Sequence, residues 1–97
     1  MGKLIQGDPW VWVVVQDPGG EEQFLGQHNE EKDIIFLPTF LEKADAQGCL
    51  KHLALVEAKR YEVQAIQYNE LARHSADNGF MVFILNGSGD ILEKIMP

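Results

Sequence analysis

The feature that most constrains this chain is the run Trp10–Val15, which contains no charged side chain. Its residues are tryptophan and valine, which fit the pleated surface of a β-sheet, so the run predicts a strand. Alternation places the two tryptophans and Val14 on one face of this strand and the other three valines on the opposite face. A strand with one solvated face would alternate with polar residues. We therefore expect the strand to lie centrally in a sheet or to offer its tryptophans to a partner.

The length and the cysteine content indicate how many domains the chain forms and in which compartment it is expected. The 97 residues are typical of one domain, which at this length folds without a metal or a disulfide. Cys49 is the only cysteine, which excludes an internal disulfide and fits a reducing compartment. No apolar run approaches the roughly 20 residues that span a bilayer, and the N-terminus lacks the apolar region of a signal peptide. We expect a cytoplasmic protein that makes no contact with a membrane, with a lead-in segment at residues 1–9 and one domain at residues 10–97.

The charge of the chain restricts its partners. Eight Lys and Arg residues against 15 Asp and Glu residues give a net charge of −7. Binding to a phosphate backbone requires clustered basic side chains, and the only adjacent basic pair is Lys59–Arg60. We therefore expect no nucleic-acid partner, whereas a basic protein partner is compatible with this charge.

Apolar patterns and turn residues predict six strands. They are expected at Trp10–Val15, Glu22–Gln27, Asp33–Pro38, Arg60–Tyr68, Phe80–Leu85 and Ile91–Met96. The residues between them include Asp17-Pro18-Gly19-Gly20, a polar connection at residues 28–32 and a turn at Asn86–Asp90. The first three strands are expected to form an antiparallel meander.

Two helices are predicted between these strands. The first begins at Thr39, which has capping-box spacing to Glu42, and ends near Glu57–Lys59. Asn69 is predicted to cap a second, shorter helix that ends at Asn78-Gly79. Each helix is amphipathic on one stripe. The sequence therefore predicts an α+β domain with a mixed sheet of five or six strands, in the order β-β-β-α-β-α-β-β.

Two of these segments carry a family resemblance. Phe36-Leu37-Pro38-Thr39-Phe40, a strand ending in Pro-x-Phe before an alanine-containing helix, resembles the N-terminal domain of the SseB-type (enhanced serine sensitivity) family. The later apolar strand that ends at Asn86-Gly87 resembles the last turn of that family. The similarity spans about Trp10 to Ile95. It implies the fold and assigns no catalytic residue.

Few residues are arranged for catalysis. Cys49 and His52 are the only thiol and imidazole that lie close in sequence, and a histidine can activate a thiol at this helical spacing. Cys49 nevertheless belongs to the buried stripe of its helix, where a cysteine acts as a small hydrophobe. The chain also lacks the nucleophile-elbow, zincin and P-loop motifs. We expect no enzymatic activity and no catalytic residue.

Metal and phosphate sites are not expected either. His28, Glu30, Glu31 and Asp33 carry metal-ligating groups on one loop, but their spacing matches no recognised site. Gly87-Ser88-Gly89 precedes a strand, whereas a phosphate loop usually precedes a helix whose N-terminus holds the anion. This segment is predicted to be a hairpin turn. We expect no cofactor and no metal.

The tryptophans remain as candidate functional residues. Trp10 and Trp12 share a face, and tryptophan is enriched at protein interfaces. Two helices are not expected to cover both faces of the sheet, which favours a homodimer or another protein as the cover. In a monomer, residues 1–9 or the loop Gln27–Lys32 would have to cover the second face instead. The first hypothesis is a small acidic protein-interaction or regulatory domain without catalysis. Its alternative is an acidic inhibitor or immunity-type protein that blocks a basic enzyme, and a third option is a ligand sensor whose pocket is lined by the tryptophans, Tyr61 and Tyr68.

Overall fold

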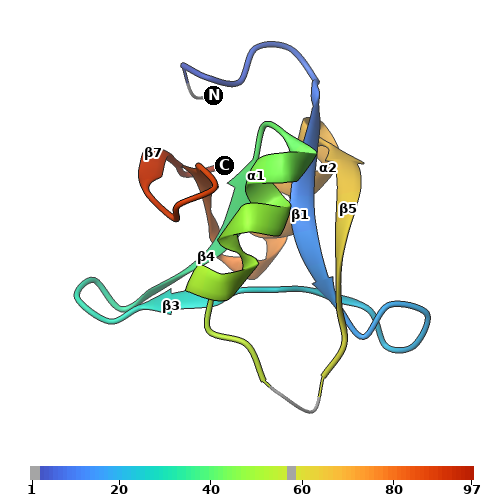
Figure 1. The fold of residues 1–97 in the computed structure, drawn as a ribbon. Coiled ribbons are helices and arrows are strands. Elements are labelled where there is room, and N and C mark those ends of the chain that lie inside the picture. The colour runs from blue at the N-terminus through green and yellow to red at the C-terminus, as the bar shows by residue number, and fades with distance from the viewer. Residues whose placement is uncertain (1–2, 57–58) are drawn as a thin grey trace.

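Strand β1 (Trp10–Gln16) lies at the centre of the sheet, as its sequence predicts (Figure 1). The computed structural model of the protein describes residues 3–56 and 59–97. One edge of β1 pairs antiparallel with β5 (Tyr61–Gln67) along its whole length. The other edge pairs antiparallel with the end of β4 (Ile34–Phe40) and with the short β2 (Gln23–Phe24). Both edges of β1 are therefore occupied within the chain.

Strand β4 joins the two halves of the sheet. Its N-terminal half pairs antiparallel with β3 (Gln27–Asn29) on the edge that also contacts β1. Its opposite edge runs parallel to β6 (Met81–Leu85), which in turn pairs antiparallel with β7 (Ile91–Ile95). The fold is an α+β domain with a mixed, seven-stranded sheet in the order β-β-β-β-α-β-α-β-β.

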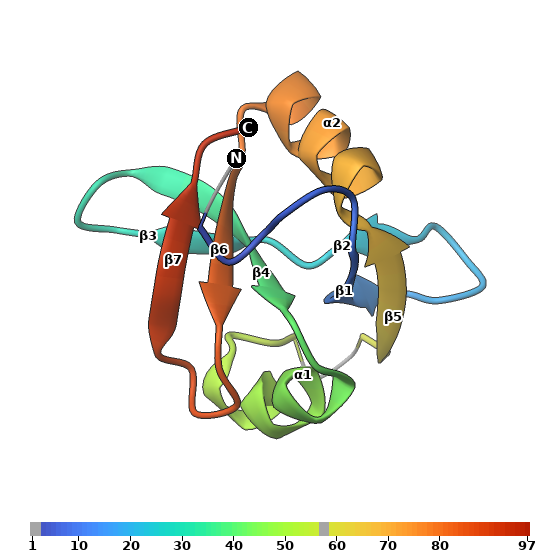
Figure 2. The ribbon, with the colours of Figure 1, turned by 90° about the horizontal axis from the view of Figure 1, so that it is seen from above.

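The two α-helices lie on opposite faces of this sheet (Figure 2). α1 (Lys43–Cys49) continues into a 3₁₀ turn, η1 (Leu50–His52), whereas α2 (Tyr68–Asn78) follows β5 directly. Each face has its own apolar cluster. Val11, Val13 and Val15 belong to the cluster beside α2, and Val14 belongs to the cluster beside α1, which confirms the predicted alternation for the valines. Neither helix in the described part of the chain is long and apolar enough to cross a membrane.

The lead-in segment covers part of the α2 face. Ile5 has 0% exposure and belongs to the same apolar cluster as Val11 and Leu71. The Glu93 carboxylate on β7 accepts hydrogen bonds from the backbone N–H groups of Lys3 and Leu4, at 2.6 and 2.8 Å. Figure 2 shows the segment crossing this face before the chain enters β1. The chain itself therefore supplies a cover that the two helices alone do not provide.

The same segment caps the N-terminus of α2. The Asp8 carboxylate accepts a hydrogen bond from the Asn69 N–H at 2.7 Å, and the Pro9 carbonyl accepts one from the Tyr68 N–H at 2.9 Å. The prediction that Asn69 is the N-cap is wrong, because Gln67 occupies that position without a side-chain capping bond. A carboxylate satisfies a free helical N–H and is favoured by the helix dipole, so Asp8 takes over the capping role. The predicted end of the helix is confirmed by the left-handed Gly79 (φ 72°).

The predicted second strand, Glu22–Gln27, is divided into β2 and β3. The Leu25 N–H donates to the Val14 carbonyl at 2.8 Å, which keeps this residue beside β1. A Cβ on Gly26 would lie 3.2 Å from Ile35 Cγ2, so the chain passes close to β4 at the next residue. The segment thus crosses from the edge of β1 to the edge of β4. As a result, His28 and Asn29 lie in a strand instead of the predicted loop, and the sheet gains a strand.

The first helix begins later than predicted. Thr39 is fully buried in β4 opposite Val13, and its hydroxyl donates to the Leu37 carbonyl at 3.1 Å. The side chain is therefore unavailable for a capping box with Glu42, and α1 begins at Lys43. The strand pairing of Thr39 stabilises an extended conformation that the local helix signal does not predict.

The helix also ends earlier than predicted. Leu53 has an extended backbone after η1. The Gln27 side chain then accepts a hydrogen bond from the Ala54 N–H at 2.9 Å and donates one to the Ala54 carbonyl at 3.1 Å. This contact holds the segment in an extended form. The predicted helix end at Glu57–Lys59 falls mainly on residues 57–58, which lie outside the described residues.

The substitution Ile5→Ala tests the packing of the lead-in segment. Removing a fully buried isoleucine side chain leaves a cavity, so the free energy of unfolding should fall by roughly 2–4 kcal/mol. Leu4→Ala is the matched control, because Leu4 is 44% exposed; it should cost less than about 1 kcal/mol. Urea denaturation followed by tryptophan fluorescence measures both values. Equal stability of the two variants would show that the segment is not part of the core.

Candidate functional site

The two predicted interaction residues have different environments. Trp10, at the start of β1, is 62% exposed. Trp12 packs against the apolar cluster beside α1, and the Lys43 Nζ lies 5.5 Å from the centroid of its ring. A cation at this distance from an indole ring is attracted by its π electrons. Trp12 therefore has its partner within the chain, whereas Trp10 faces solvent.

Trp10 borders a small hollow at the junction of β1, β5 and α2. The hollow has a volume of about 250 Å³, and its lining residues are Trp10, Val13, Phe24, Gln64, Ala65, Ile66 and Glu70. The strand register explains this composition, because Trp10 pairs with Gln67, the last residue of β5. Glu70 lies one turn further along, at the start of α2. The register thus brings an exposed tryptophan and a carboxylate to one site.

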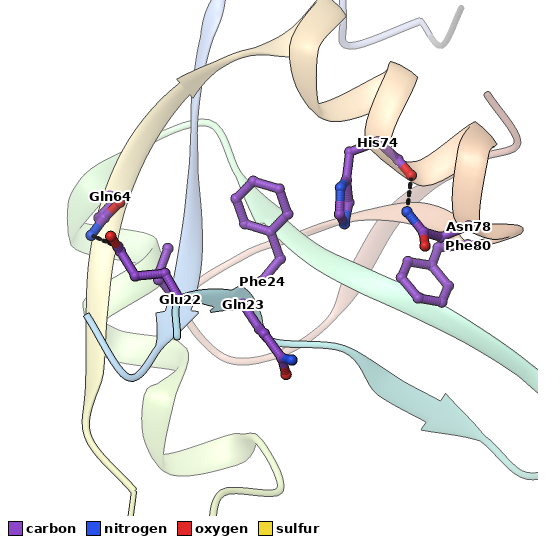
Figure 3. A pocket seen from close by; sticks show the side chains of 8 residues that line it. Glu22, Gln23, Phe24, Gln64, His74, Asn78 and Phe80 are labelled. Atoms are coloured by element: carbon purple, nitrogen blue, oxygen red, sulfur yellow. Dashed lines mark hydrogen bonds between the residues drawn. The ribbon is translucent and has the colours of Figure 1, made fainter. Parts of the chain in front are cut away.

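A larger hollow adjoins the first. It has a volume of about 630 Å³, and its lining residues are Val15, Glu22, Gln23, Phe24, Gln64, His74, Asn78 and Phe80 (Figure 3). Phe24 and Gln64 line both hollows. The two hollows are therefore neighbours beside α2, and we call them together the α2 groove.

Three rings form the apolar part of the α2 groove. The His74 ring on α2 lies between the rings of Phe24 and Phe80 (Figure 3). Its centroid is 4.8 Å from that of Phe24 in an edge-to-face arrangement, and 6.2 Å from that of Phe80 in a tilted one. Edge-to-face pairs at such distances are favourable beyond the area that they bury. These contacts give the groove an ordered aromatic wall.

The backbone holds these rings in place. Phe24 pairs with Val15 in the short ladder between β1 and β2. The Phe80 N–H donates to the Ser75 carbonyl at 2.8 Å, which places Phe80 directly after the end of α2. The Asn78 side chain donates to the His74 carbonyl at 2.8 Å. The sequence singles out none of Glu70, His74 and Phe80 as site residues, because only the docking of α2 onto the sheet brings them to Phe24.

The edge of the α2 groove is acidic. Glu22 and Glu70 line it, and the Gln64 amide donates to Glu22 Oε2 at 3.5 Å and to Glu62 Oε1 at 3.2 Å. None of the lining residues is Lys or Arg. Within residues 3–56 and 59–97 the ion pairs are Lys59–Asp17 and His28–Asp33, and neither involves a groove carboxylate. The groove therefore combines an aromatic wall with carboxylates that form no ion pair within residues 3–56 and 59–97.

The other candidate residues do not form a site of comparable extent. Cys49 is fully buried in the cluster beside α1, while His52 is exposed on η1. Burial raises the pKa of the Cys49 thiol, which disfavours the thiolate needed for nucleophilic attack. Among the described residues, no hydrogen bond joins the two side chains. The geometry favours the structural interpretation of Cys49.

The acidic loop brings together one pair of possible ligands. His28 Nε2 lies 2.9 Å from Asp33 Oδ1. In the described part of the chain, no group of three His, Cys, Asp or Glu side chains is placed to hold a metal ion. Asn86–Asp90 forms the predicted hairpin turn, in which the Asn86 side-chain oxygen accepts hydrogen bonds from the Ser88 and Asp90 N–H groups at 3.0 and 2.9 Å. The Asn86 side-chain oxygen is therefore hydrogen-bonded within the turn itself.

The tyrosines of the proposed sensor pocket lie on opposite faces of the sheet. Tyr68 is buried in the cluster beside α2, and Tyr61 packs against the cluster beside α1. Burial raises the pKa of the Tyr68 hydroxyl, and the nearby Glu93 carboxylate raises it further. The Tyr61 hydroxyl accepts a hydrogen bond from the Val56 N–H at 2.8 Å. The two side chains do not share a pocket, so this interpretation receives no support from the geometry.

Comparison with protein-family models, with curated proteins and with solved structures finds no match for this chain. The resemblance to the SseB-type family thus stays a prediction.

Thiol reactivity tests the role of Cys49. Because the thiol is buried and its pKa is raised, a thiol reagent such as a nitrobenzoate disulfide should label the native protein far more slowly than the protein in urea. Cys49→Ala should lower the free energy of unfolding by about 1 kcal/mol, through a small cavity. Native-state labelling as fast as that of a free thiol would contradict the structural role.

Proposed function

We propose that this chain is a small, non-catalytic interaction domain that binds another protein through the α2 groove. The observation that carries the proposal is the 62% exposure of Trp10 beside a concave, aromatic and acidic surface. Exposed indole area is unfavourable in water, and tryptophan is strongly enriched among the residues that dominate binding energy at interfaces. The buried, single cysteine fits a cytoplasmic location, which is part of the proposal.

The groove has the composition of an interface. Trp10, Phe24 and Phe80 supply aromatic side chains, which interfaces use at their centres. Glu22, Glu70 and Gln64 supply a polar edge, which interfaces use at their rims. A partner side chain placed in the groove would bury the rings while its polar groups meet the edge.

Charge supports a basic partner over a second copy of the chain. In a symmetric homodimer the same surface meets itself, so the groove carboxylates of the two subunits would face each other. Each subunit would also carry a net charge of −7. With a basic partner, both the repulsion between groove carboxylates and the repulsion between the net charges are absent. Long-range attraction between the two proteins then speeds association. An acidic inhibitor of a basic enzyme is therefore the form of this function that the charge supports best.

The structure weakens the reason to expect self-association through an uncovered apolar face. The sequence predicts a homodimer or a permanent protein partner because two helices are too few to cover the sheet. Ile5 in the lead-in segment supplies additional cover on the α2 face. The buried positions of β1 and β6, such as Val11, Val13 and Phe83, are covered without a second chain. Trp10 remains as the large aromatic side chain that β1 leaves to solvent.

Selection of displayed random peptides on the immobilised protein tests this proposal. The enriched peptides should contain basic and apolar residues, and their binding should weaken as salt rises. Trp10→Ser should weaken binding roughly 30-fold, which corresponds to about 2 kcal/mol for a central interface tryptophan. Glu31→Gln is the control, because Glu31 is exposed on the loop between β3 and β4 and does not line the groove. Peptides that bind wild type and Trp10→Ser equally well, or a selection that yields none, would contradict the proposal.

Analytical ultracentrifugation tests whether a second copy of the chain binds in the groove. At micromolar concentration the wild type should sediment as a monomer at both low and high salt, because like charges disfavour pairing and the apolar clusters are largely covered. A dimer that strengthens as salt screens the charge, and that Trp10→Ser abolishes, would instead identify a second copy as the occupant of the groove.

A further inference from the structure

We infer that the corner of the α2 groove formed by Trp10 and Glu70 binds an arginine side chain of the partner. This inference rests on the proposed function and specifies its chemistry. The guanidinium group would stack on the indole ring of Trp10 and donate hydrogen bonds to the Glu70 carboxylate. It is the partner group that best satisfies both residues at once.

The first observation is that cations in the described part of this chain lie near two of its aromatic rings, and that Trp10 is not one of them. Lys43 Nζ lies 5.5 Å from the ring centroid of Trp12, and Lys94 Nζ lies 5.3 Å from that of Phe83. Both rings thus have a cation from the chain itself. Trp10, the more exposed tryptophan, has no such contact among the described residues. Tryptophan is the strongest aromatic partner for a cation, so its open face is the natural place for one.

The second observation is the carboxylate beside this ring. Glu70 lines the same hollow as Trp10, is exposed, and has no ion-pair partner in the described part of the chain. Trp10 and Glu70 are close because Trp10 pairs with Gln67. Gln67 immediately precedes α2, and Glu70 lies in the first turn of α2. Both residues are held by regular secondary structure. The backbone positions of the two residues are therefore fixed before any partner arrives.

Arginine fits this pair of groups better than lysine does. The guanidinium group is planar, so it can stack flat on an indole ring while its edge donates two parallel hydrogen bonds to a carboxylate. An ammonium group is a compact and strongly hydrated point charge that cannot do both. A neutral analogue of the same shape, such as citrulline, keeps the stacking area and loses the charge.

Nuclear magnetic resonance of the ¹⁵N-labelled full chain tests the inference. The probes are Nα-acetyl-arginine amide, the corresponding lysine compound and the neutral citrulline compound, at constant ionic strength. The arginine compound should shift the Trp10 indole N–H signal saturably, more than lysine does and far more than citrulline does. The Trp12 indole signal, whose ring already has Lys43 over it, is the internal control and should stay in place.

Three variants assign the interaction. Glu70→Gln should weaken arginine binding by about threefold or more, as expected for loss of an exposed ion pair. Glu31→Gln removes an exposed carboxylate on the loop between β3 and β4, which does not line the groove, and should leave the affinity unchanged. In Trp10→Leu, the Glu70 amide signal serves as the reporter, and its response to arginine should fall. All three positions are on the surface, and unchanged dispersion of the remaining signals confirms that each variant is folded.

The outcomes separate this inference from the proposed function. Equal shifts with arginine and citrulline, or no shift of Trp10, would overturn the arginine site. If groove-dependent peptides were still selected in that case, the proposed function would stand. A saturable arginine shift that Glu70→Gln reduces would support the arginine site. If no groove-dependent peptide were found, that shift would still support the site but count against the groove as a protein interface.

Discussion

Burial of β1 on both faces is the constraint on which the rest of the structure depends. Val11, Val13 and Val15 require one apolar layer and Val14 requires another, so the domain needs cover on each side of the sheet. α1 supplies one layer. α2 and Ile5 together supply the other, and Asp8 fixes their junction by capping the helix. The lead-in segment is thus part of the packing and also determines where α2 begins.

The same arrangement explains why a groove remains. α2 starts at the end of β5 and packs on the valines of β1, while β2 and Phe24 lie beside it at the other end of β1. The space between them is only partly filled, by the rings of Phe24, His74 and Phe80. Trp10 borders the smaller hollow and Phe80 borders the larger one. A concave aromatic surface is therefore a direct result of how the helix crosses the strands.

The electrostatic character of the groove follows from the composition of the chain. With 15 acidic residues against eight basic ones, carboxylates outnumber the cations that could pair with them. Two cations that approach aromatic rings do so elsewhere, over Trp12 and Phe83. The groove edge is left with Glu22 and Glu70. Part of the excess negative charge of the chain therefore lies at the edge of the α2 groove, beside its aromatic side chains.

Local patterns determined much of the fold. The unbroken apolar run Trp10–Val15 specified a central strand, because no polar residue is available to make one face of the strand suited to water. Turn residues such as Gly79 and Asn86 also act locally, so the ends of α2 and β6 could be predicted. The boundaries of α1 could not, because the strand pairing of Thr39 and the contact of Gln27 with Ala54 join residues that are distant in sequence. Trp10 could be named as a candidate from the sequence, but its contrast with Trp12 could not. That difference, and the meeting of Glu70, His74 and Phe24, were decided by tertiary packing alone, since burial and proximity depend on residues that local patterns do not connect.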